Sequence, residues 1–391
     1  MVSVFEAKGI VDAYTAPKSK INNLTADLIG LHLAECVVAC CDVPPFDNSA
    51  MDGYAVHYQP DKKIYLISQK IRAGEVSTHR LGLGEAARVY TGAPVPLGAD
   101  TVIQQEHISL QENVISLSVN TGVRGMNIRL RGSQCKTGEL VAASGSLITP
   151  GLIGLLASVG ITQVSIFEPS VVGIIVTGDE LLPPGAPLLP GKIYNSNGIA
   201  LQSYCKLLNI TPQIIMQVPD DPAIIRNQMA ICLERCDILL LSGGISVGDY
   251  DYIQESLRQE GVEKLFYKVK QKPGKPLFFG KKNDTLVFGL PGNPAAALTC
   301  FNQYVKPCIQ KKIGYSDVWK PDAMLSIESH YRKPSGLTHF LKAKKNNQTA
   351  TILERQQSFD LLSFNQADCF VEIPEAESEI EKEAILPIYY W

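Results

Sequence analysis

Two apolar runs decide the fold: Val171-Val172-Gly173-Ile174-Ile175-Val176 and, directly after Asp237, Ile238-Leu239-Leu240-Leu241. Helical patterns over 199–208 and 222–233 lie between them. A continuous apolar run of this length is typical of a strand buried on both faces of a sheet. Alternation of such strands with helices predicts a parallel sheet with helices on both faces.

The alternation of strands and helices extends from residue 171 to about residue 315. On either side of this section the pattern of hydrophobic and turn-forming residues changes. Further elements expected inside this section are strands at 213–216 and 285–289 and helices at 252–259 and 294–305. Residues 43–150 carry short alternating runs broken by glycine and proline, which predict a β-rich section. The last ~75 residues return to short strands and predict a small β domain. Two more helices are expected, at 152–159 and within 20–41, the latter capped by Thr25 or Asp27.

Composition sets the class of protein. The chain has 391 residues, which predicts two or three domains, and 45% hydrophobic with 19% charged residues is typical of a globular protein. A net charge of −3 excludes a generally basic nucleic-acid binder. No run approaches the ~18–20 apolar residues of a membrane span, and the N-terminus lacks the pattern of a signal peptide. Ten cysteines without a Cys-x-x-Cys motif predict buried free thiols. We therefore expect a cytoplasmic protein that binds neither nucleic acid nor membrane.

Three loops follow expected strands of the parallel sheet: 177–181, 242–252 and 289–294. Each alone is adequately explained as a glycine-containing turn between a strand and a helix. Ligands of open parallel sheets bind beyond the carboxyl ends of the strands, so three such loops at one edge favour a phosphate-bearing ligand. The candidate ligand-binding residues in the last two loops are Ser242, Gly243, Gly244, Ser246, Pro291, Gly292, Asn293 and Pro294.

Charged residues near these loops extend the candidate site. Asp249 and Asp251 follow the glycines of the second loop and are candidates to hold Mg²⁺ against phosphate oxygens. Lys272 and Lys275 are separated by Pro273-Gly274, and such turn residues would fix two cations for phosphate binding. Most lysines between 264 and 282 are expected to form a solvated face.

The β-rich section contributes a different motif, Asp47-Asn48-Ser49-Ala50-Met51-Asp52-Gly53-Tyr54-Ala55-Val56. Two carboxylates, an amide and a hydroxyl within six residues exceed what a turn requires, although a loop capped by Asp47 would also explain them. Thr91-Gly92-Ala93-Pro94-Val95-Pro96 adds a hydroxyl, and Arg129 and Arg131 add planar cations suited to oxyanions.

Six segments together resemble the molybdopterin molybdenumtransferase family, which includes the MoeA proteins and the E domain of gephyrin. The segments are 47–56, 91–96, 177–181, 242–252, 272–276 and 289–294. Their order and spacing match the family from about residue 20 to the C-terminus. One such segment is moderately specific, whereas six in order are highly specific.

The resemblance implies an α/β multi-domain protein with four parts. A MoaB-like, molybdopterin-binding α/β domain with a parallel sheet would span 167–317, with residues 1–19 as a candidate to pack on it. A β-rich domain would span 45–136, and a linking domain would be built from 20–44 and 137–166. A β-barrel domain would span 318–391. The resemblance also implies a homodimer whose active-site cleft draws the β-rich domain of one chain towards the α/β domain of the other.

The family's reaction inserts molybdate into adenylylated molybdopterin, with Mg²⁺-dependent release of AMP, to give molybdenum cofactor. The resemblance implies catalytic roles for Asp52, Thr91, Glu180 and Asp251. Metal binding would fall to Asp251, to Asp249 and to Asp220 or Asp221, and ligand binding to the loop residues named above with Lys272 and Lys275. Molybdoenzymes and pterin adenylyltransferases are the implied partner proteins.

The chain departs from the family pattern at several positions. Ser133 and Gln134 stand where the family has an acidic pair, Leu337 and Lys342 stand where it has arginines, and Gln357-Ser358 replaces Gly-Ser. Neutral groups do not replace a metal ligand or a bidentate clamp for an oxyanion. Two alternatives therefore stand beside the transferase: a catalytically impaired or non-enzymatic paralogue that binds or scaffolds molybdopterin and, more weakly, a molybdopterin adenylyltransferase.

Overall fold

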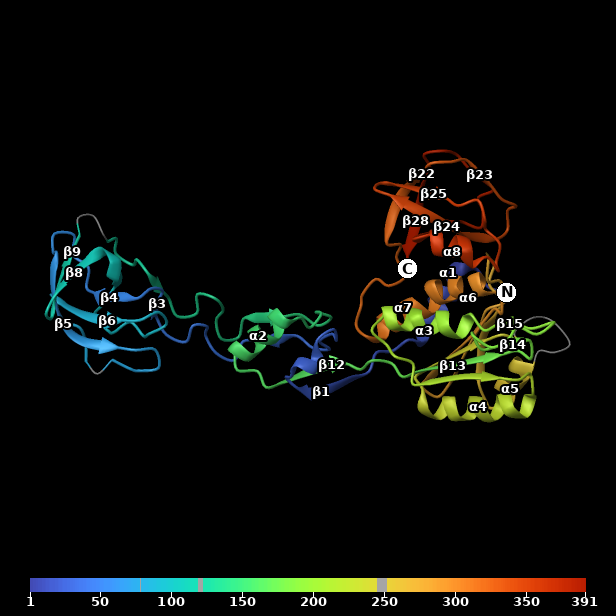
Figure 1. Ribbon diagram of the computed structural model, residues 1–391, viewed down its shortest axis with the longest axis horizontal. Helices are drawn as coiled ribbons and strands as arrows, with labels where there is room; N and C mark the ends of the chain where they lie inside the picture. The colour runs from blue at the N-terminus through green and yellow to red at the C-terminus, as the bar shows by residue number, and fades with distance from the viewer. Residues whose placement is uncertain (78, 119–121, 245–251) are drawn as a thin grey trace. The chain divides into compact units, whose positions relative to one another are not determined.

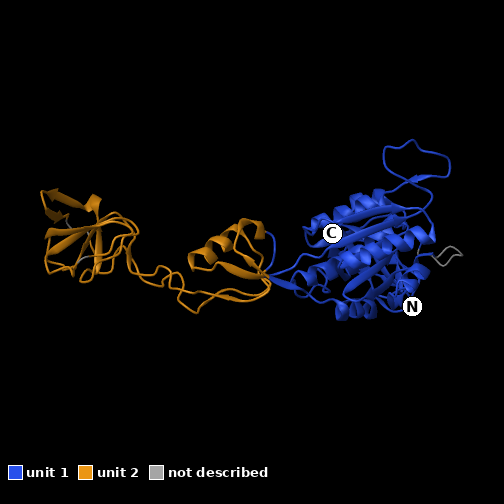
Figure 2. Ribbon diagram, turned by 90° about the horizontal axis from the view of Figure 1, so that it is seen from below, with its two compact units in different colours: residues 1–20, 30–32, 166–391 blue, residues 21–29, 33–165 orange. Residues whose placement is uncertain are grey.

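The computed structural model describes residues 1–77, 79–118, 122–244 and 252–391 (Figure 1). The chain forms two compact units, coloured separately in Figure 2. Unit 1 contains residues 1–20, 30–32 and 166–391, and unit 2 contains 21–29 and 33–165. The chain passes between them within β1 (Ser19–Asn23), on either side of residues 30–32, and within β12 (Gln163–Phe167). Among the described residues, no helix is long and apolar enough to cross a membrane.

A six-stranded sheet forms the centre of unit 1, in the order β16-β13-β17-β21-β20-β18. The four parallel strands are β16 (Ile214–Val218), β13 (Val172–Thr177), β17 (Ile238–Ser242) and β21 (Thr285–Leu290). β20 (Phe278–Lys282) and β18 (Glu263–Tyr267) complete the sheet by antiparallel pairing. Every residue of β13, β17 and β21 is buried, which confirms the burial predicted from the apolar runs of β13 and β17.

Helices cover both faces of this sheet (Figure 1). On one face lie α1 (Val4–Tyr14), α3 (Asn197–Leu207) and α6 (Pro294–Cys300), which continues through a π-helical turn, η3 (Phe301–Val305), into α7 (Lys306–Lys312). On the other lie α4 (Pro222–Arg235) and α5 (Tyr252–Gln259). Successive side chains of β13 alternate between the two cores: Ile174 and Val176 pack in the first and Ile175 in the second.

The C-terminal part of unit 1 is a closed barrel of five strands, in the order β24-β25-β22-β28-β26 with β26 pairing back to β24. The strands are β22 (Ala323–Ile327), β24 (Thr338–Asn346), β25 (Thr349–Ile352), β26 (Cys369–Ile373) and β28 (Ile385–Tyr390). β19 (Gln271–Lys272) pairs with β24, so the chain of the α/β domain adds a short strand to the barrel. The remaining elements here are α8 (Leu361–Gln366), β23 (Tyr331–Arg332) and β27 (Glu379–Ile380).

Unit 2 contains the β-rich section. Its six-stranded sheet has the order β7-β4-β6-β5-β9-β8. These strands are β7 (Thr101–Gln104), β4 (Gly53–Val56), β6 (Glu85–Val89), β5 (Ile64–Ile71), β9 (Val114–Leu117) and β8 (Ile108–Gln111). Two strand pairs are also present, β3 (Asn48–Ser49) with β10 (Ile128–Arg129) and β2 (Val37–Val38) with β11 (Leu140–Ala142), beside α2 (Pro150–Ser158) and the 3₁₀ turns η1 (Ala26–Leu28) and η2 (Gln105–His107). The predicted fold class is confirmed, and the exact domain boundaries remain a prediction.

Two sequence-based predictions were wrong. Residues 20–41 form strands and one short 3₁₀ turn instead of a helix, and Thr25 makes no side-chain cap. The backbone N–H groups of Leu24 and Ala34 donate instead to Thr162 O and Ser165 O, at 2.9 and 2.8 Å. All ten cysteines are free and seven are buried, but Cys36 and Cys40 are exposed, contrary to the prediction of buried thiols.

Candidate functional site

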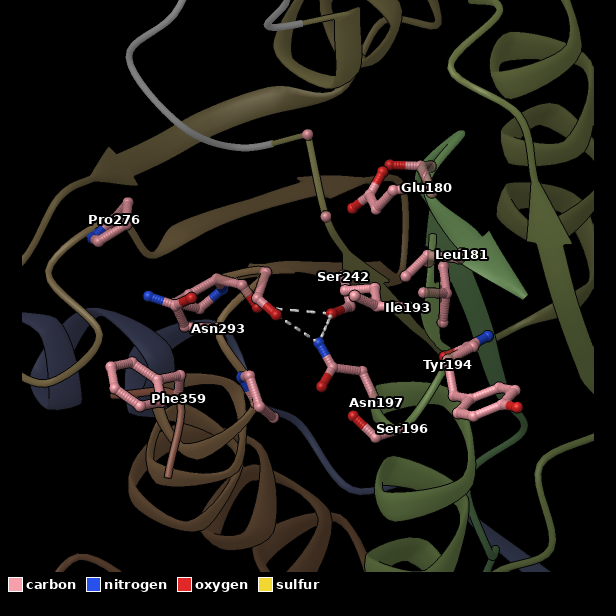
Figure 3. A pocket seen from close by; sticks show the side chains of 18 residues that line it. Glu180, Leu181, Ile193, Tyr194, Ser196, Asn197, Ser242, Pro276, Asn293 and Phe359 are labelled. Atoms are coloured by element: carbon pink, nitrogen blue, oxygen red, sulfur yellow. Dashed lines mark hydrogen bonds between the residues drawn. The ribbon is translucent and has the colours of Figure 1, made fainter. Parts of the chain in front are cut away.

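A pocket of about 560 Å³ lies where β13, β17 and β21 end (Figure 3). Thr177 is the last residue of β13, Ser242 of β17 and Leu290 of β21, so the three loops meet at the carboxyl edge of the parallel sheet. The volume falls within the roughly 300–1,000 Å³ range of small-molecule sites. The pocket is therefore where the sequence places a ligand site.

The pocket brings together most of the predicted loop residues that the structure describes. Those that line it are Glu180, Ser242, Gly243, Gly244, Pro291, Gly292, Asn293 and Pro294. Ser246, Asp249 and Asp251 lie outside the described residues. The second loop is thus represented here by Ser242 and its two glycines.

Asn197, which the sequence reasoning missed, links two of these loops. Its amide nitrogen donates to Ser242 Oγ at 2.9 Å and to the carbonyl oxygen of Gly292 at 2.8 Å (Figure 3). Asn197 is only 8% exposed and Ser242 is fully buried, so the bond to Ser242 is shielded from water, whereas Gly292 is an exposed residue. Asn195 and Ser196 line the pocket beside it. The polar run Asn195-Ser196-Asn197-Gly198, which spans the start of α3, was the available sequence signal.

The floor of the pocket depends on one glycine. Gly243 has a φ of +100°, and a Cβ there would stand 2.3 Å from the carbonyl oxygen of Thr177. Only glycine permits this approach of the β17 loop to the end of β13. Within the described part of the chain, the buried atoms Thr177 Oγ1 and Asn197 Oδ1 have no hydrogen-bond partner. Both residues line the pocket, so it contains a hydroxyl and an amide oxygen that form no hydrogen bond with another described residue.

The Lys272-to-Lys275 loop is held by a buried amide. Gln271 is fully buried, and its Nε2 donates to the carbonyl oxygens of Pro273 and Gly274 at 3.1 and 3.2 Å. The hydroxyl of Tyr304 donates to Gln271 Oε1. The two exposed lysines therefore lie on a loop that is held in place, and this loop leads directly into Pro276, which lines the pocket.

The lysines themselves differ from their neighbours. Lys270 and Lys281 pair with Glu375 and Glu263, whereas neither Lys272 nor Lys275 forms an ion pair with any described residue. Lys272 lies opposite His339 across the β19–β24 pair. Burial, with the charges of Lys333 and Lys272, lowers the pKa of His339 to about 4. His339 is therefore neutral at physiological pH and does not neutralise an anion.

The acidic residues of the first loop are engaged to different degrees. Glu180 is exposed and lines the pocket. Asp179 and Asp220 exchange hydrogen bonds, each backbone N–H donating to the other's carboxylate at 3.4 and 3.1 Å. Asp221 Oδ1 caps α4 by accepting from Ala223 N and Ile224 N, both at 2.9 Å. The cap gives Asp221 a structural function, whereas the carboxylate of Glu180 forms no hydrogen bond or ion pair with another described residue.

The donor set fits Mg²⁺ held jointly with a ligand. Mg²⁺ keeps several waters and is usually bound by one or two carboxylates together with substrate phosphates. Glu180 in the pocket supplies such a carboxylate, and Asp220 lies on the neighbouring loop, joined to it through Asp179. Among the described residues, the one cluster of three metal-ligating side chains is elsewhere, on the exposed surface at His330, Glu379 and Glu381.

Asp52 and Thr91, for each of which the resemblance implies a catalytic role, are in contact within unit 2. Asp52 Oδ1 accepts from Thr91 N at 2.8 Å and from Thr91 Oγ1 at 2.9 Å. The backbone bond from Thr91, then its hydroxyl bond, lower the pKa of Asp52, so the carboxylate is charged at neutral pH. Thr91 is exposed, which leaves the pair accessible to a ligand.

Gln134, one of the positions at which the sequence departs from the family pattern, lies in a turn beside a carboxylate that is already hydrogen-bonded. Gln134 is exposed in unit 2, and its backbone N–H donates to Val43 O at 2.9 Å. The carboxylate of Asp42 lies beside the same turn but accepts three hydrogen bonds, two from Thr137 and one from Arg131. These bonds, those from Thr137 first, lower the pKa of Asp42 to about 2. Asp42 is thus occupied and does not replace the missing acidic pair.

Lys342, at the position of a family arginine, is 3% exposed in the barrel. Its ammonium donates to the carbonyl oxygens of Gln357 and Asp360, at 3.1 and 3.3 Å. Burial lowers the pKa of Lys342, an effect opposed by the charge of Asp360. The lysine supports backbone next to the pocket, where Phe359, also missed by sequence reasoning, forms part of the lining.

Fold and site together define a small-molecule-binding α/β enzyme whose pocket is built from strand-end loops. Residues 2–160 match the family model described as the MoeA N-terminal region (domain I and II), and residues 173–311 match that of a probable molybdopterin binding domain. The chain is 32% identical to a molybdopterin molybdenumtransferase of Staphylococcus aureus strain Mu50, over 88% of this chain and 84% of the relative. It is also 32% identical to a molybdopterin molybdenumtransferase of Haemophilus influenzae, over 89% of this chain and 88% of the relative.

The solved structures agree. A MoeA protein of Pyrococcus horikosii matches 100% of this chain and 99% of its own, with a TM-score of 0.85 and 28% identity. The chain belongs to the molybdopterin molybdenumtransferase family, and it is a transferase.

Proposed function

We propose that this protein inserts molybdate into adenylylated molybdopterin, with release of AMP, to give molybdenum cofactor in the cytoplasm. The observation that carries the proposal is the pocket at the carboxyl edge of the sheet, which is lined by eight of the predicted site residues, all in loops that match the family. Curated relatives that align over most of this chain bear the name of this activity. The proposal assigns the pocket to the nucleotide-linked pterin.

The pocket residues would divide the work. The glycine loops and the N-terminus of α6 present backbone N–H groups to phosphate oxygens, and Lys272 and Lys275 offset their charge. Glu180 and Asp220, with Asp249 and Asp251, are the residues we assign to Mg²⁺. Bound Mg²⁺ would stabilise the negative charge on the departing AMP. Asn197 keeps Ser242 and Gly292 in register while the ligand binds.

Asp52 and Thr91 lie in unit 2, whereas the pocket lies in unit 1. We propose that the protein is a homodimer and that each active site combines the pocket of one chain with the Asp52–Thr91 pair of the other. The charged Asp52 carboxylate would orient the water that releases AMP, and the Thr91 hydroxyl would hold that carboxylate in position.

The direct experiment supplies purified protein with adenylylated molybdopterin, Mg²⁺ and molybdate and follows AMP. We expect release, and we expect Glu180→Gln to reduce its rate by roughly 100-fold because the metal-facing carboxylate is lost. Glu234→Gln, on α4 and outside the pocket, is the matched control and should leave the rate unchanged. Binding of the ligand without any release of AMP would contradict the catalytic assignment.

A second function is favoured by Ser133 and Gln134, which stand where the resemblance implies an acidic pair, and by Asp42, whose carboxylate is already engaged beside them. On this alternative the protein binds or scaffolds molybdopterin without completing the reaction. Ser133→Asp combined with Gln134→Asp distinguishes the two, since activity that appears only in the double variant would favour the scaffold.

A further inference from the structure

The C-terminal barrel contributes an aromatic side chain to the pocket. Phe359 lies between β25 and α8, it is 64% exposed, and it lines the pocket. In Figure 3 its ring lies beside Asn293, on the side of the pocket away from Tyr194. Since an aromatic ring this exposed contributes little to the core, its position needs another explanation.

The backbone before Phe359 is tied to the α/β domain. Ser358 O accepts from Ala296 N, in the first turn of α6, at 3.1 Å. Ser358 Oγ accepts from Asn293 Nδ2 at 2.9 Å, and Asn293 lines the pocket. Two hydrogen bonds thus fix the residue next to Phe359 against the loop that follows β21.

Two buried charges hold the same segment from the barrel side. The Lys342 ammonium donates to the carbonyl oxygens of Gln357 and Asp360, which bracket Ser358 and Phe359. The carboxylate of Asp360, a residue only 4% exposed, caps α8 through its Oδ1 and pairs with Arg355 through its Oδ2 at 2.6 Å. A buried charge is tolerated only where its partners are well placed, so this arrangement fixes the backbone on both sides of Phe359.

A rigidly mounted, exposed aromatic face at a pocket rim is suited to stacking on a flat ring. We propose that Phe359 is a specificity-determining residue that stacks on the fused heteroaromatic ring of the phosphate-bearing ligand. The inference rests on the proposed function, whose substrate carries two such rings, the adenine and the pterin. Tyr194 is less free to serve, because its hydroxyl is bonded to Ala186 O at 2.9 Å.

The test compares Phe359→Ala, Phe359→Leu and Phe359→Trp by calorimetric titration with AMP and with ribose 5-phosphate, which lacks the base. Loss of stacking should weaken AMP binding by roughly 5- to 50-fold in the alanine and leucine variants, while tryptophan retains it. Ribose 5-phosphate should bind all four proteins alike. Leu362→Ala, at an exposed apolar residue of α8 outside the pocket, is the matched control and should behave as the parent protein.

Adenylylated molybdopterin identifies which ring is stacked. If Phe359→Leu binds adenylylated molybdopterin more weakly than the parent protein does but binds AMP equally well, Phe359 stacks on the pterin, and the inference stands. The inference is overturned if Phe359→Leu binds both ligands with the affinity of the parent protein. It is also overturned if the affinity for ribose 5-phosphate falls by the same factor as the affinity for AMP. The proposed function fails separately: a parent protein that shows the stacking pattern but releases no AMP keeps the inference and loses the catalytic assignment.

Discussion

Replacement of Asn197 by alanine tests the architecture of the pocket most sharply. The amide is the donor that joins Ser242 at the end of β17 to Gly292 after β21. Asn197→Ala removes both bonds and adds no new group. We expect lower stability of unit 1 and weaker ligand binding, because two pocket loops lose their connection.

The magnitude follows from the burial of the two acceptors. The bond to Gly292, an exposed residue, should contribute about 1 kcal/mol, because water can replace it. Ser242 is fully buried, and its remaining contact, to Pro291 O, is long at 3.4 Å. Its hydroxyl would lose a buried partner at a further cost of about 1–2 kcal/mol. The free energy of unfolding should therefore fall by about 2–3 kcal/mol.

Tryptophan fluorescence during urea denaturation measures this effect selectively. The chain has two tryptophans, Trp319 and Trp391, and both lie in unit 1. With a denaturant slope of roughly 1–3 kcal/mol per molar urea, the midpoint should fall by about 1 M. Gln213→Ala removes an exposed amide from the same unit and should change the free energy of unfolding by less than about 0.5 kcal/mol.

A double-mutant cycle supplies the result that would refute the reasoning. In a Ser242→Ala background no hydroxyl is left without a partner, so Asn197→Ala should then cost only about 1 kcal/mol. A coupling energy of zero, or a loss below about 0.5 kcal/mol in the single variant, would show that the amide does not connect the loops.

Three further predictions concern the shared site and its titrating groups. Asp52→Asn and Glu180→Gln should each abolish most AMP release. When the two variants are co-expressed, half of the dimers should contain one chain of each kind, and each such dimer has one intact site, so about a quarter of the activity should return. If no activity returns, the active site is not shared between chains. Thr91→Val keeps the backbone bond to Asp52 but removes the hydroxyl, so the pKa of Asp52 should rise towards its ordinary value in a carboxyl NMR titration, and an unchanged pKa would count against the pairing. His339 has a pKa of about 4 in the folded protein, so the unfolded chain binds more protons than the folded one between pH 6.5 and 4. The free energy of unfolding should therefore fall as the pH falls through that window, by up to about 2 kcal/mol at pH 5. In His339→Gln this fall should be smaller, and an equal fall in both proteins would assign the acid sensitivity to another group.

The sequence predicted the sheet and three of its loops because those signals are local. The run 172–176 is apolar without interruption because Ile174 and Ile175 face opposite cores, and each core is built of apolar side chains. The glycines after Ser242 likewise mark a close approach of backbone, which Gly243 makes to Thr177. Such features depend on a residue and its immediate neighbours.

The residues that were missed depend on distant partners. Asn197 is placed by acceptors 45 and 95 residues further along the chain. The polar run at 195–198 marks the start of α3, but it does not single out Asn197 as the residue that joins two loops. Phe359 reaches the pocket because Ser358 is bonded to Asn293 and because Lys342 supports the surrounding backbone. The helix expected within 20–41 failed for the same reason, since Leu24 pairs with Thr162 instead of with its own neighbours.

The central claim is that this protein transfers molybdenum to the pterin as AMP leaves. The most direct measurement is the ratio of molybdenum bound in the isolated pterin product to AMP released, with parent protein, adenylylated molybdopterin, Mg²⁺ and molybdate. We predict equal amounts of the two, with AMP release dependent on molybdate. Release of AMP without incorporation of molybdenum would contradict the transferase assignment, because the protein would then only hydrolyse the adenylate.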